Sequence, residues 1–409
     1  MRPLKLIGIG FLLFITACSW PHQFDMRPEE AERHYKRGLA FYNKKEYYQA
    51  LDTYLQATNV RRNYPEAWVG SGLCYARLQN QVGAEDAFKQ ALVYRPDYPE
   101  AIYNLGILYF DRKQDDLAVA HLTQAIEASD TSYPRAYYAF GVVHERRNRE
   151  KEAETAYRKA LALDQNLLDA HLNLGTLLQK QKLFDEAIGH YKEALRIDPD
   201  ALKAYHNLGF AYMDQHLDSL AIATYKSGLT RQDDNANWLN NLGVLYERNA
   251  RFDEVLEVFH KAIEADTTLI IAQFNLGLLH DDQGRYPRAI NRYRQVIEWD
   301  KRDSTYKEAY FNLGVLYKET GHLDVALEAY QHLTMLDSTY ANAYYNMGII
   351  LQETDQYSDA LSTFKQFIAY SSNTQLISQV NQVITWLKQV VARQEEQEEV
   401  GWKVGRETQ

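Results

Sequence analysis

The triplet Asn-Leu-Gly occurs six times in this chain of 409 residues, at 104–106, 173–175, 207–209, 241–243, 275–277 and 312–314. A seventh copy, Asn346-Met347-Gly348, differs only in its middle residue. Between Asn173 and Asn275 the triplet returns every 34 residues. A fixed period of roughly 20 to 50 residues indicates a repeat protein whose units stack on their neighbours. The length of the chain therefore does not predict several independent domains.

Ten glycines fit one repeat when each is placed at the eighth position, and the repeats then begin at residues 31, 65, 99, 134, 168, 202, 236, 270, 307 and 341. Twelve positions after the glycine comes a small residue, almost always alanine, and four positions later a large one, as in Gly72, Ala84 and Phe88. In each half of the repeat, apolar residues at i, i+3, i+4 and i+7 predict an amphipathic helix. Turn residues separate the halves, so each repeat is predicted to be an antiparallel helical hairpin.

Repeat 65–98 has the fullest pattern, with Trp68, Gly72, Tyr75, Ala84, Phe88, Ala91 and Pro96. This pattern resembles the tetratricopeptide repeat (TPR) family, and the resemblance covers residues 31–374. It implies an all-α fold, a right-handed α-solenoid (superhelix) of about ten hairpins. It also implies that the first helix of each repeat lines a concave groove, with the sixth position among the groove residues.

After the last repeat, one more apolar stripe extends from Leu376 to Val391. A solenoid needs a terminal element that covers its last open face, so residues 375–394 are predicted to form a capping helix. A helix that docks a partner is the alternative. Residues 395–409 are predicted to be a mobile polar tail, because they begin with a run of glutamates.

The N-terminus carries a predicted targeting signal. Arg2 and Lys5 precede an apolar run that is too short to cross a membrane, as in secretory signal peptides. Residues 15–18, Ile-Thr-Ala-Cys, resemble the bacterial lipobox, which predicts a signal peptide at 1–17, a lipid on Cys18 and a tether at 18–30. An ordinary signal with a chance cysteine is the alternative. Ser19 favours the outer membrane, facing the periplasm.

Residues for catalysis, metal binding or nucleic-acid binding form no recognisable pattern. The formal net charge of −10 argues against a protein that coats nucleic acid, since such binding depends on cations that meet phosphate. The histidines are never spaced i, i+4, so no helix face offers a pair for a metal. No phosphate-binding loop or nucleophile elbow is present. The sequence therefore predicts a protein that is not an enzyme and has no cofactor and no metal.

The sixth position of the repeat is asparagine in seven repeats: Asn104, Asn173, Asn207, Asn241, Asn275, Asn312 and Asn346. An asparagine amide can pair with both the N–H and the C=O of an extended peptide. The row resembles the asparagine ladder in the TPR domain of O-linked N-acetylglucosamine transferase. This resemblance implies a peptide-binding groove. The alternative is a solvated groove residue without a ligand.

The fifth position is often aromatic, and the candidate ligand-contacting rings are Tyr103, Tyr138, Phe274, Phe311 and Tyr345. Aromatic rings bury a large area at low entropic cost. Packing against the neighbouring repeat is the alternative role. The late repeats carry Asp281, Asp282, Glu319 and Glu353 on the expected groove, so a basic or neutral peptide is the expected guest there.

These features together predict an interaction scaffold, lipid-anchored in the bacterial envelope, that binds an extended segment of another envelope protein. The resemblance to TPR lipoproteins implies a role in assembling pili, secretion channels or outer-membrane proteins. Recruitment of cell-wall or polysaccharide machinery through the aromatic residues is a second hypothesis. Service as an accessory subunit of a separately encoded enzyme is a third.

Overall fold

The computed structural model describes residues 28–299 and 304–407. The predicted signal peptide and Cys18 lie outside these residues, as does most of the predicted tether. The chain divides into two compact units, Met1–Pro199 and Asp200–Gln409.

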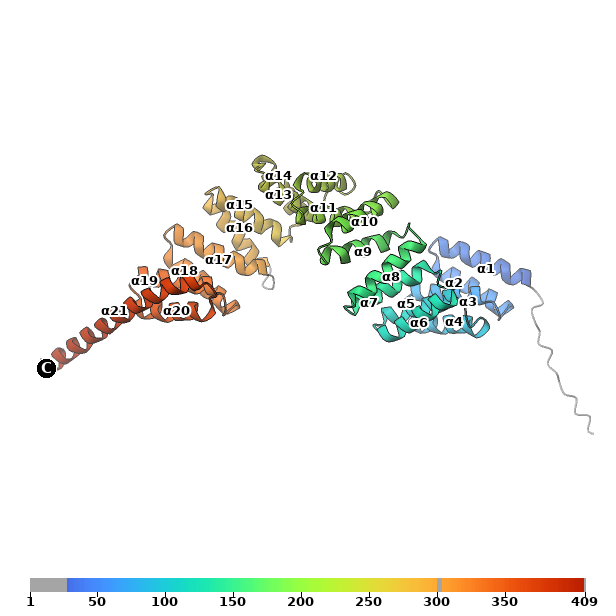
Figure 1. Cartoon of the computed structure of the whole chain (residues 1–409), viewed down its shortest axis with the longest axis horizontal. Helices are drawn as coiled ribbons and strands as arrows, with labels where there is room; N and C mark the ends of the chain where they lie inside the picture. Colours follow the sequence, from blue (N-terminus) through green and yellow to red (C-terminus); the bar gives the residue numbers. More distant parts are fainter. Residues whose placement is uncertain (1–27, 300–303, 408–409) are drawn as a thin grey trace, which may run out of the picture. The chain divides into compact units, whose positions relative to one another are not determined.

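Within the described residues every element of regular structure is a helix, and consecutive helices pair as antiparallel hairpins (Figure 1). The first unit contains α1 (Pro28–Asn43), α2 (Tyr47–Val60), α3 (Pro65–Arg77), α4 (Gln81–Tyr94), α5 (Pro99–Asp111), α6 (Asp115–Ala128), α7 (Pro134–Arg146), α8 (Glu150–Leu163), α9 (Leu168–Lys180) and α10 (Phe184–Ile197). The predicted all-α solenoid of helical hairpins is confirmed.

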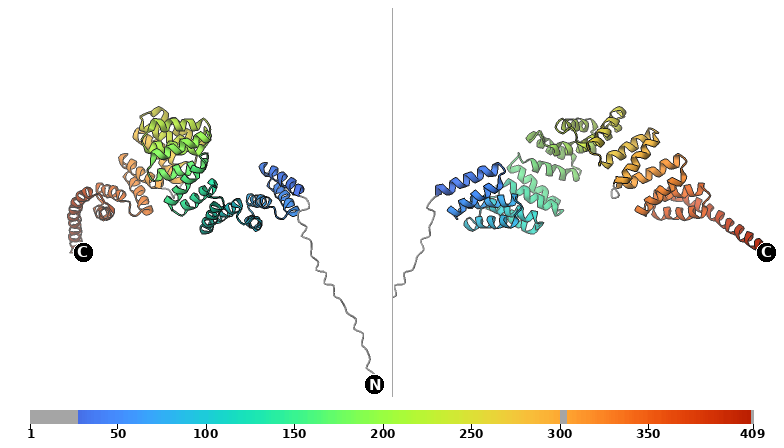
Figure 2. Two further views of the ribbon diagram at one scale, coloured as in Figure 1. Left: turned by 45° about the vertical axis from the view of Figure 1, so that its right-hand side comes forward. Right: turned by 180° about the vertical axis from the view of Figure 1, so that it is seen from behind.

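The second unit continues with the same hairpin and closes with one long helix. It contains α11 (Leu202–Asp214), α12 (Asp218–Leu229), α13 (Ala236–Arg248), α14 (Phe252–Ala265), α15 (Ile270–Asp282), α16 (Tyr286–Trp299), α17 (Ser304–Glu319), α18 (Leu323–Leu336), α19 (Ala341–Glu353), α20 (Tyr357–Tyr370) and α21 (Thr374–Glu407). Figure 2 shows the hairpins of each unit from two further sides.

Each hairpin closes where the repeat glycine meets the large residue of the second helix. A Cβ added to Gly72 would lie 2.4 Å from Cε1 of Phe88, and one added to Gly175 would lie 2.6 Å from Cε1 of Tyr191. Both rings are buried. Glycine is therefore required because the aromatic ring occupies the space that any side chain would fill.

The turn between the two helices of each hairpin contains one residue in the left-handed region. The residues concerned are Lys45, Gln79, Lys113, Asn148, Lys182, His216, Ala250, Gly284, Gly321 and Asp355, all at the fifteenth repeat position. A left-handed residue after the last turn of a helix ends it and reverses the chain. Only two of the ten are glycine, although glycine adopts this conformation at the lowest cost.

α21 covers the end of the last hairpin. Its residues Val380, Ile384 and Leu387 are buried in one cluster with Phe364 and Phe367 of α20. The helix extends to Glu407, past residue 394, where the sequence analysis places the start of a mobile tail. Glutamate, glutamine and arginine have high helix propensity, so the polar segment after residue 394 contains no immediate signal that ends the helix.

Candidate functional site

The seven candidate asparagines all lie half-buried on the first helices of their hairpins. Asn104 and Asn173 belong to the first unit, on α5 and α9. The second unit carries the others on α11, α13, α15, α17 and α19, in the order Asn207, Asn241, Asn275, Asn312 and Asn346. We call the side of these helices that carries the sixth and ninth repeat positions the first-helix face, and we describe it separately in each unit.

Several of these amides donate a hydrogen bond to the preceding hairpin. Nδ2 of Asn241 lies 3.0 Å from the hydroxyl of Tyr225, and Nδ2 of Asn312 lies 3.4 Å from the hydroxyl of Tyr293. In the first unit, Asn173 contacts the hydroxyl of Tyr157 at 3.4 Å. One amide hydrogen is thus used to join neighbouring repeats, a role that the sequence analysis did not assign.

Three other asparagines differ from this arrangement. Nδ2 of Asn275 donates to Oδ1 of Asn240, the fifth-position residue of the preceding repeat, at 3.0 Å. Asn104 and Asn346 donate instead to backbone carbonyls of their own helices, at Glu100 (2.7 Å) and Asn342 (3.0 Å). The row is therefore continuous in sequence but not uniform in its contacts. An amide still has a carbonyl oxygen and a second hydrogen after making one such bond.

The tyrosines that receive these bonds connect them to the hairpin interior. The hydroxyl of Tyr157 donates a hydrogen bond to Oε2 of Glu145 at 2.7 Å. The oxygen of this hydroxyl also accepts the hydrogen bond from Asn173. Burial raises the pKa of Tyr157, and the hydrogen bond to Glu145 raises it further. The hydroxyl therefore keeps its proton and acts as donor and acceptor at once.

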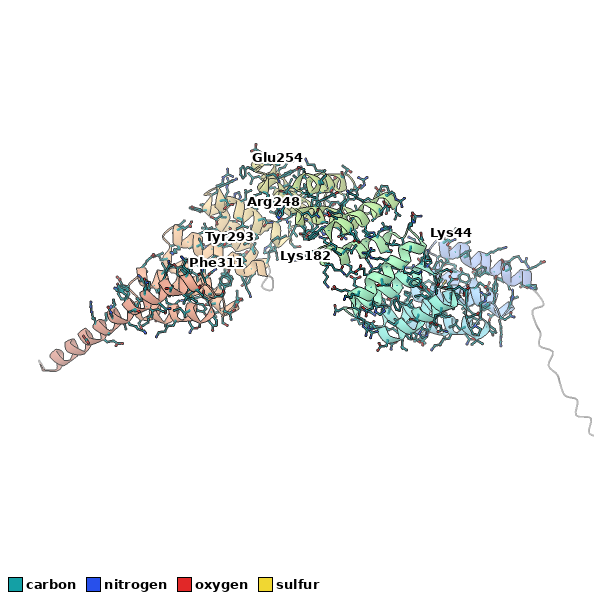
Figure 3. All side chains as sticks on the ribbon, viewed as in Figure 1. Lys44, Lys182, Arg248, Glu254, Tyr293 and Phe311 are labelled. Atoms are coloured by element: carbon teal, nitrogen blue, oxygen red, sulfur yellow. The ribbon has the colours of Figure 1, made fainter. Side chains whose placement is uncertain are left out.

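The candidate aromatic residues pack on other rings. Tyr103 contacts Tyr133, with ring centroids 5.2 Å apart, and Tyr138 contacts Tyr157 at 5.9 Å. In the second unit, Phe274 lies 5.6 Å from Tyr293, Phe311 lies 5.6 Å from Tyr340, and Tyr345 lies 5.4 Å from Phe367. Figure 3 labels Tyr293 and Phe311, on α16 and α17. Each of these residues is half-buried, so its ring stiffens the repeat and leaves only part of its surface accessible.

A row of apolar residues on the first-helix face was not singled out from the sequence. It occupies the ninth position, directly after each repeat glycine. The first unit carries Leu39, Leu73, Ile107 and Val142, with the polar Thr176 at this position in its fifth repeat, and the second carries Phe210, Val244, Leu278, Val315 and Ile349. All of them are half-buried or exposed, and Phe210 is 46 % exposed. The recurrence of an aliphatic or aromatic residue after the glycine was the signal that could have found this row.

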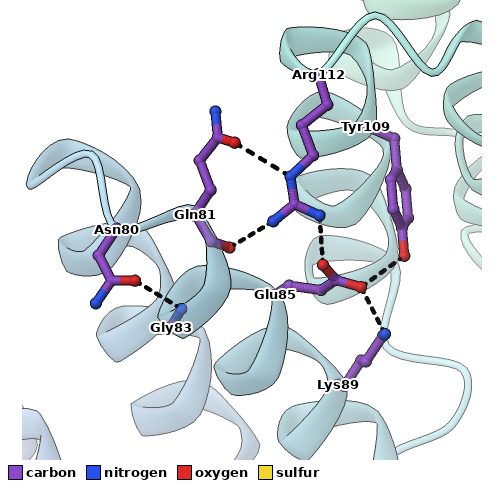
Figure 4. Close-up of polar contacts among 7 residues, drawn as sticks. All are labelled: Asn80, Gln81, Gly83, Glu85, Lys89, Tyr109 and Arg112. Atoms are coloured by element: carbon purple, nitrogen blue, oxygen red, sulfur yellow. Dashed lines mark hydrogen bonds and ion pairs between the residues drawn. The ribbon is translucent and has the colours of Figure 1, made fainter.

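Cations near the ends of the first helices are used in contacts between hairpins. Figure 4 shows Arg112 paired with Glu85 of the preceding hairpin, where Glu85 also accepts from Lys89 at 2.6 Å and from Tyr109 at 3.0 Å. The hydrogen bond from Lys89, together with that from Arg112, lowers the pKa of Glu85 to about 2. Similar pairs join Arg146 to Asp115, Lys180 to Glu150, and Arg248 to Asp218.

Carboxylates of the second unit have a different environment. Burial raises the pKa of Asp281, and the charges of Glu319 and Asp282 raise it further. Burial also raises the pKa of Glu247, with Asp282 as the second cause. These residues lie on α13, α15 and α17, at the twelfth and thirteenth repeat positions. The same two repeat positions on these helices also carry the cations Arg248 and Lys318.

The described residues offer few other features that could form a metal site, a membrane span or a ligand pocket. No group of three or more His, Cys, Asp or Glu residues there is placed to hold a metal ion. None of the described helices combines the length and apolar character needed to cross a membrane. A depression of about 470 Å³ lies beside α7 and α8 and is lined by Tyr137, Phe140, Lys151, Glu152, Thr155, Ala156 and Lys159, none of which is a candidate site residue.

Buried histidines predict a loss of stability in weak acid. Burial lowers the pKa of His144, His190 and His280 below the ordinary value of 6.5. The unfolded chain therefore binds protons that the folded chain excludes, so the stabilisation is complete above pH 6.5 and is lost progressively below it. We expect the free energy of unfolding to fall by at most about 1.4 kcal/mol per histidine for each pH unit below 6.5.

Urea unfolding at pH 7.5 and pH 5.5 measures this effect. His144 is the informative residue, because both of its ring nitrogens are buried without a hydrogen-bond partner. His144→Phe is expected to reduce the pH dependence, whereas His332→Gln, at an exposed histidine, should leave it unchanged. An unchanged dependence in His144→Phe would contradict the assignment.

The hairpins and the side-chain rows on their first helices define the class of protein, a helical repeat protein that presents extended faces. The chain belongs to the tetratricopeptide repeat family. Models described as tetratricopeptide repeat match residues 35–99, 97–166, 167–197, 239–269, 274–338 and 342–374. A model described as TPR repeat matches residues 183–215. Tetratricopeptide repeats are generally non-catalytic modules that bind other proteins.

Several solved structures are similar to this chain at low sequence identity. PilF of Pseudomonas aeruginosa is 18 % identical with a TM-score of 0.46, and the match covers 50 % of this chain and 92 % of that one. A tetratricopeptide repeat protein from Parabacteroides merdae is 18 % identical with a TM-score of 0.46, covering 62 % and 98 %. Yeast Tom70 is 12 % identical with a TM-score of 0.44, covering 89 % and 96 %. No curated protein matches the chain.

Proposed function

We propose that this protein is a scaffold of the bacterial envelope that binds an extended segment of a partner protein along its first-helix faces. The observation that carries the proposal is the pairing of two rows on the same helices. Asparagine amides at the sixth position lie beside apolar side chains at the ninth position, as in Asn275 and Leu278 on α15, and all are accessible in part. Residues three apart on a helix are neighbours on one face.

An extended segment would use both rows. Its side chains would cover the apolar residues, while its backbone N–H and C=O groups would meet amides that have capacity left after their bonds between repeats. In the second unit this surface includes Asn241 and Val244 on α13, and Asn312 and Val315 on α17. Substituting the asparagines would also remove bonds between hairpins, so the apolar row offers the cleaner test.

Photo-crosslinking tests the binding surface. A benzophenone side chain at Phe210 of the first-helix face is expected to cross-link a segment of a partner in intact envelopes, identified by mass spectrometry. The matched control is Phe252, 52 % exposed against 46 % for Phe210, but on the second helix of its hairpin. Equal cross-linking at 210 and 252, or none at either, would refute binding along this face.

Lipidation at Cys18 is the second part of the proposal. The sequence Ile-Thr-Ala-Cys at residues 15–18 supports it. Stable anchoring takes more than one lipid chain, which a bacterial lipoprotein cysteine would supply. Fractionation of the same cells checks this part, because Cys18→Ala should move the protein from the outer-membrane fraction to an aqueous one or block its maturation. If the variant fractionates like the native chain, the proposal of a lipid anchor is wrong, while the proposal of a binding face still stands.

The hypotheses of glycan recruitment and of service to a separate enzyme gain no specific support. Tyr103, Tyr138 and Phe274 were the proposed sugar contacts, and each packs against another ring of the repeat array. Each of these rings is therefore partly committed to packing within the repeat array. The peptide-binding proposal uses atoms and surfaces that remain accessible in part.

A further inference from the structure

The segment around α16 is rich in arginine, although the chain as a whole is acidic. Residues 283–297 contain four arginines and no aspartate or glutamate, whereas the formal net charge of the chain is −10. Three of these residues, Arg285, Arg288 and Arg292, follow one another at spacings of three and four. The carbonyl of Arg285 accepts a helical hydrogen bond from the N–H of Ala289 at 3.2 Å. Because residues three or four apart on a helix are neighbours, the three arginines form a row along one side of α16.

Hydrogen bonds place this arginine row against one face of α15. The N–H of Arg285 donates to the carbonyl of His280 at 2.8 Å. At the other end of the row, Nη1 of Arg292 donates to Oε1 of Gln273 at 2.8 Å. Gln273 and His280 are seven residues apart on α15, so their side chains lie on the same face of that helix. The arginine row therefore runs along the face that carries both side chains.

No carboxylate neutralises the arginine row in the described part of the protein. Arg285 and Arg288 form no ion pair with a described side chain. The side-chain partners of Arg292 are the neutral amides of Gln273 and Gln295, at 2.8 and 3.1 Å. Arg292 is nevertheless half-buried, and burial lowers the pKa of its guanidinium group. Partial removal of a cation from water without an opposite charge is costly, so an anion beside the row would be stabilising.

The preceding hairpin has an ion pair at the corresponding positions. Where α16 has Arg285 and Arg288, the hairpin of α13 and α14 has Arg251 and Glu254. Nη2 of Arg251 lies 2.5 Å from Oε1 of Glu254. In the hairpin of α15 and α16 a second guanidinium group therefore takes the place of the carboxylate. An anion from solution would have the role that the Glu254 carboxylate has one repeat earlier.

A buried histidine beside the arginine row provides an independent observation. The side chain of His280 is 3 % exposed, and its Nδ1 has no hydrogen-bond partner in the described residues. Burial lowers the pKa of His280, and the charges of Arg288, Arg285 and Arg292 lower it further. Buried polar atoms are normally paired. A neutral imidazole that carries its proton on Nδ1 would be a further donor for an anion held by the row.

We propose that Arg285, Arg288 and Arg292, together with His280, form a binding site for a phosphate group. A guanidinium group presents planar pairs of N–H donors that match the oxygens of phosphate, and a row of three suits a group with several charged oxygens. The phosphate belongs either to a soluble phosphate or to the headgroup of a phospholipid. The site lies on the second helix of its hairpin, so it goes beyond the proposed peptide-binding face and does not depend on it.

Isothermal titration calorimetry at low salt on the full-length, detergent-solubilised protein tests the site. The probes are inorganic phosphate and dihexanoyl phosphatidic acid, which share the phosphate group but not the lipid chains. The Kd of the tighter probe should rise at least about tenfold for the variant Arg285→Gln and Arg288→Gln, because charge-assisted hydrogen bonds are lost. If inorganic phosphate binds at least as tightly as the lipid, the ligand is a soluble phosphate. Tighter binding of the lipid assigns a headgroup.

Two control variants make the result specific to the arginine row. Lys151→Gln with Lys159→Gln removes the same charge at exposed positions of α8 and should leave the Kd unchanged. Arg288→Glu restores the charge pattern of the preceding hairpin. It should abolish binding and keep the urea unfolding midpoint at or above that of the native chain, since the new carboxylate can pair with Arg285. Equal weakening by the lysine and arginine variants, undiminished binding by Arg288→Glu, or no binding of either probe to the native chain would overturn the site.

Discussion

Gly243→Ala is expected to destabilise the hairpin of α13 and α14 by about 1–3 kcal/mol, the usual cost of overpacking a core. A Cβ at this position would lie 2.4 Å from Cε1 of Phe259, and that ring is fully buried. The ring cannot move away without disturbing the helix that carries it. Urea unfolding gives the change in free energy, and hydrogen exchange of the α13 and α14 amides shows whether the loss is local.

Two further variants separate the effect of this ring contact on stability from the effect of helix propensity. Gly189→Ala, on α10, has open space around the added Cβ, so it should gain about 0.5–1 kcal/mol from the loss of glycine in a helix. Phe259→Leu should recover part of the loss in the Gly243→Ala background, since Leu122 already occupies the corresponding place above Gly106. Equal effects at positions 243 and 189 would show that the ring contact is not responsible.

Leu387→Ala is expected to cost about 2–5 kcal/mol, the range for removing a fully buried leucine side chain. Leu387 is fully buried and lies in one cluster with Ile384, Phe364 and Phe367. The loss should loosen α21 and expose the hairpin of α19 and α20, because α21 packs on α20 there. Faster hydrogen exchange in α20 and α21, with a lower midpoint in urea unfolding, would measure the effect.

Controls for this prediction come from the same helix. Lys388→Ala, at the next residue but exposed, should change stability by no more than about 0.5 kcal/mol. Truncation after residue 396 keeps every residue of α21 that the structure describes as buried, and it should leave the unfolding midpoint nearly unchanged. If truncation after 396 is as damaging as Leu387→Ala, the cover extends further along α21 than the buried residues indicate.

The hairpins could be predicted from the sequence because the interaction that builds them recurs within one repeat. Gly243 and Phe259 are 16 residues apart, and the same pair of positions meets in every repeat. Periodic apolar residues also predicted the helices on either side of each turn. The end of α21 could not be predicted in this way, because a polar helix without an early glycine or proline has no sharp stop.

The contacts of the asparagines could not be predicted either. Asn241 bonds to Tyr225 of the preceding hairpin, and Asn346, at the same repeat position, bonds to the backbone of its own helix. The choice depends on how two hairpins approach each other and on which residue stands at the facing position. The preceding repeat of Asn346 contains Tyr330, whose hydroxyl stays unpaired, although Asn and Tyr occupy the same repeat positions at both sites.

The ion pairs between hairpins, such as Arg112 with Glu85 and Lys180 with Glu150, have a consequence for how the chain is made. Each of these pairs joins residues about one repeat apart, so its formation does not depend on a distant part of the sequence. Each hairpin can therefore pack onto the preceding hairpin soon after its own residues have been synthesised. Folding of the repeat array can then proceed hairpin by hairpin while the chain is being synthesised.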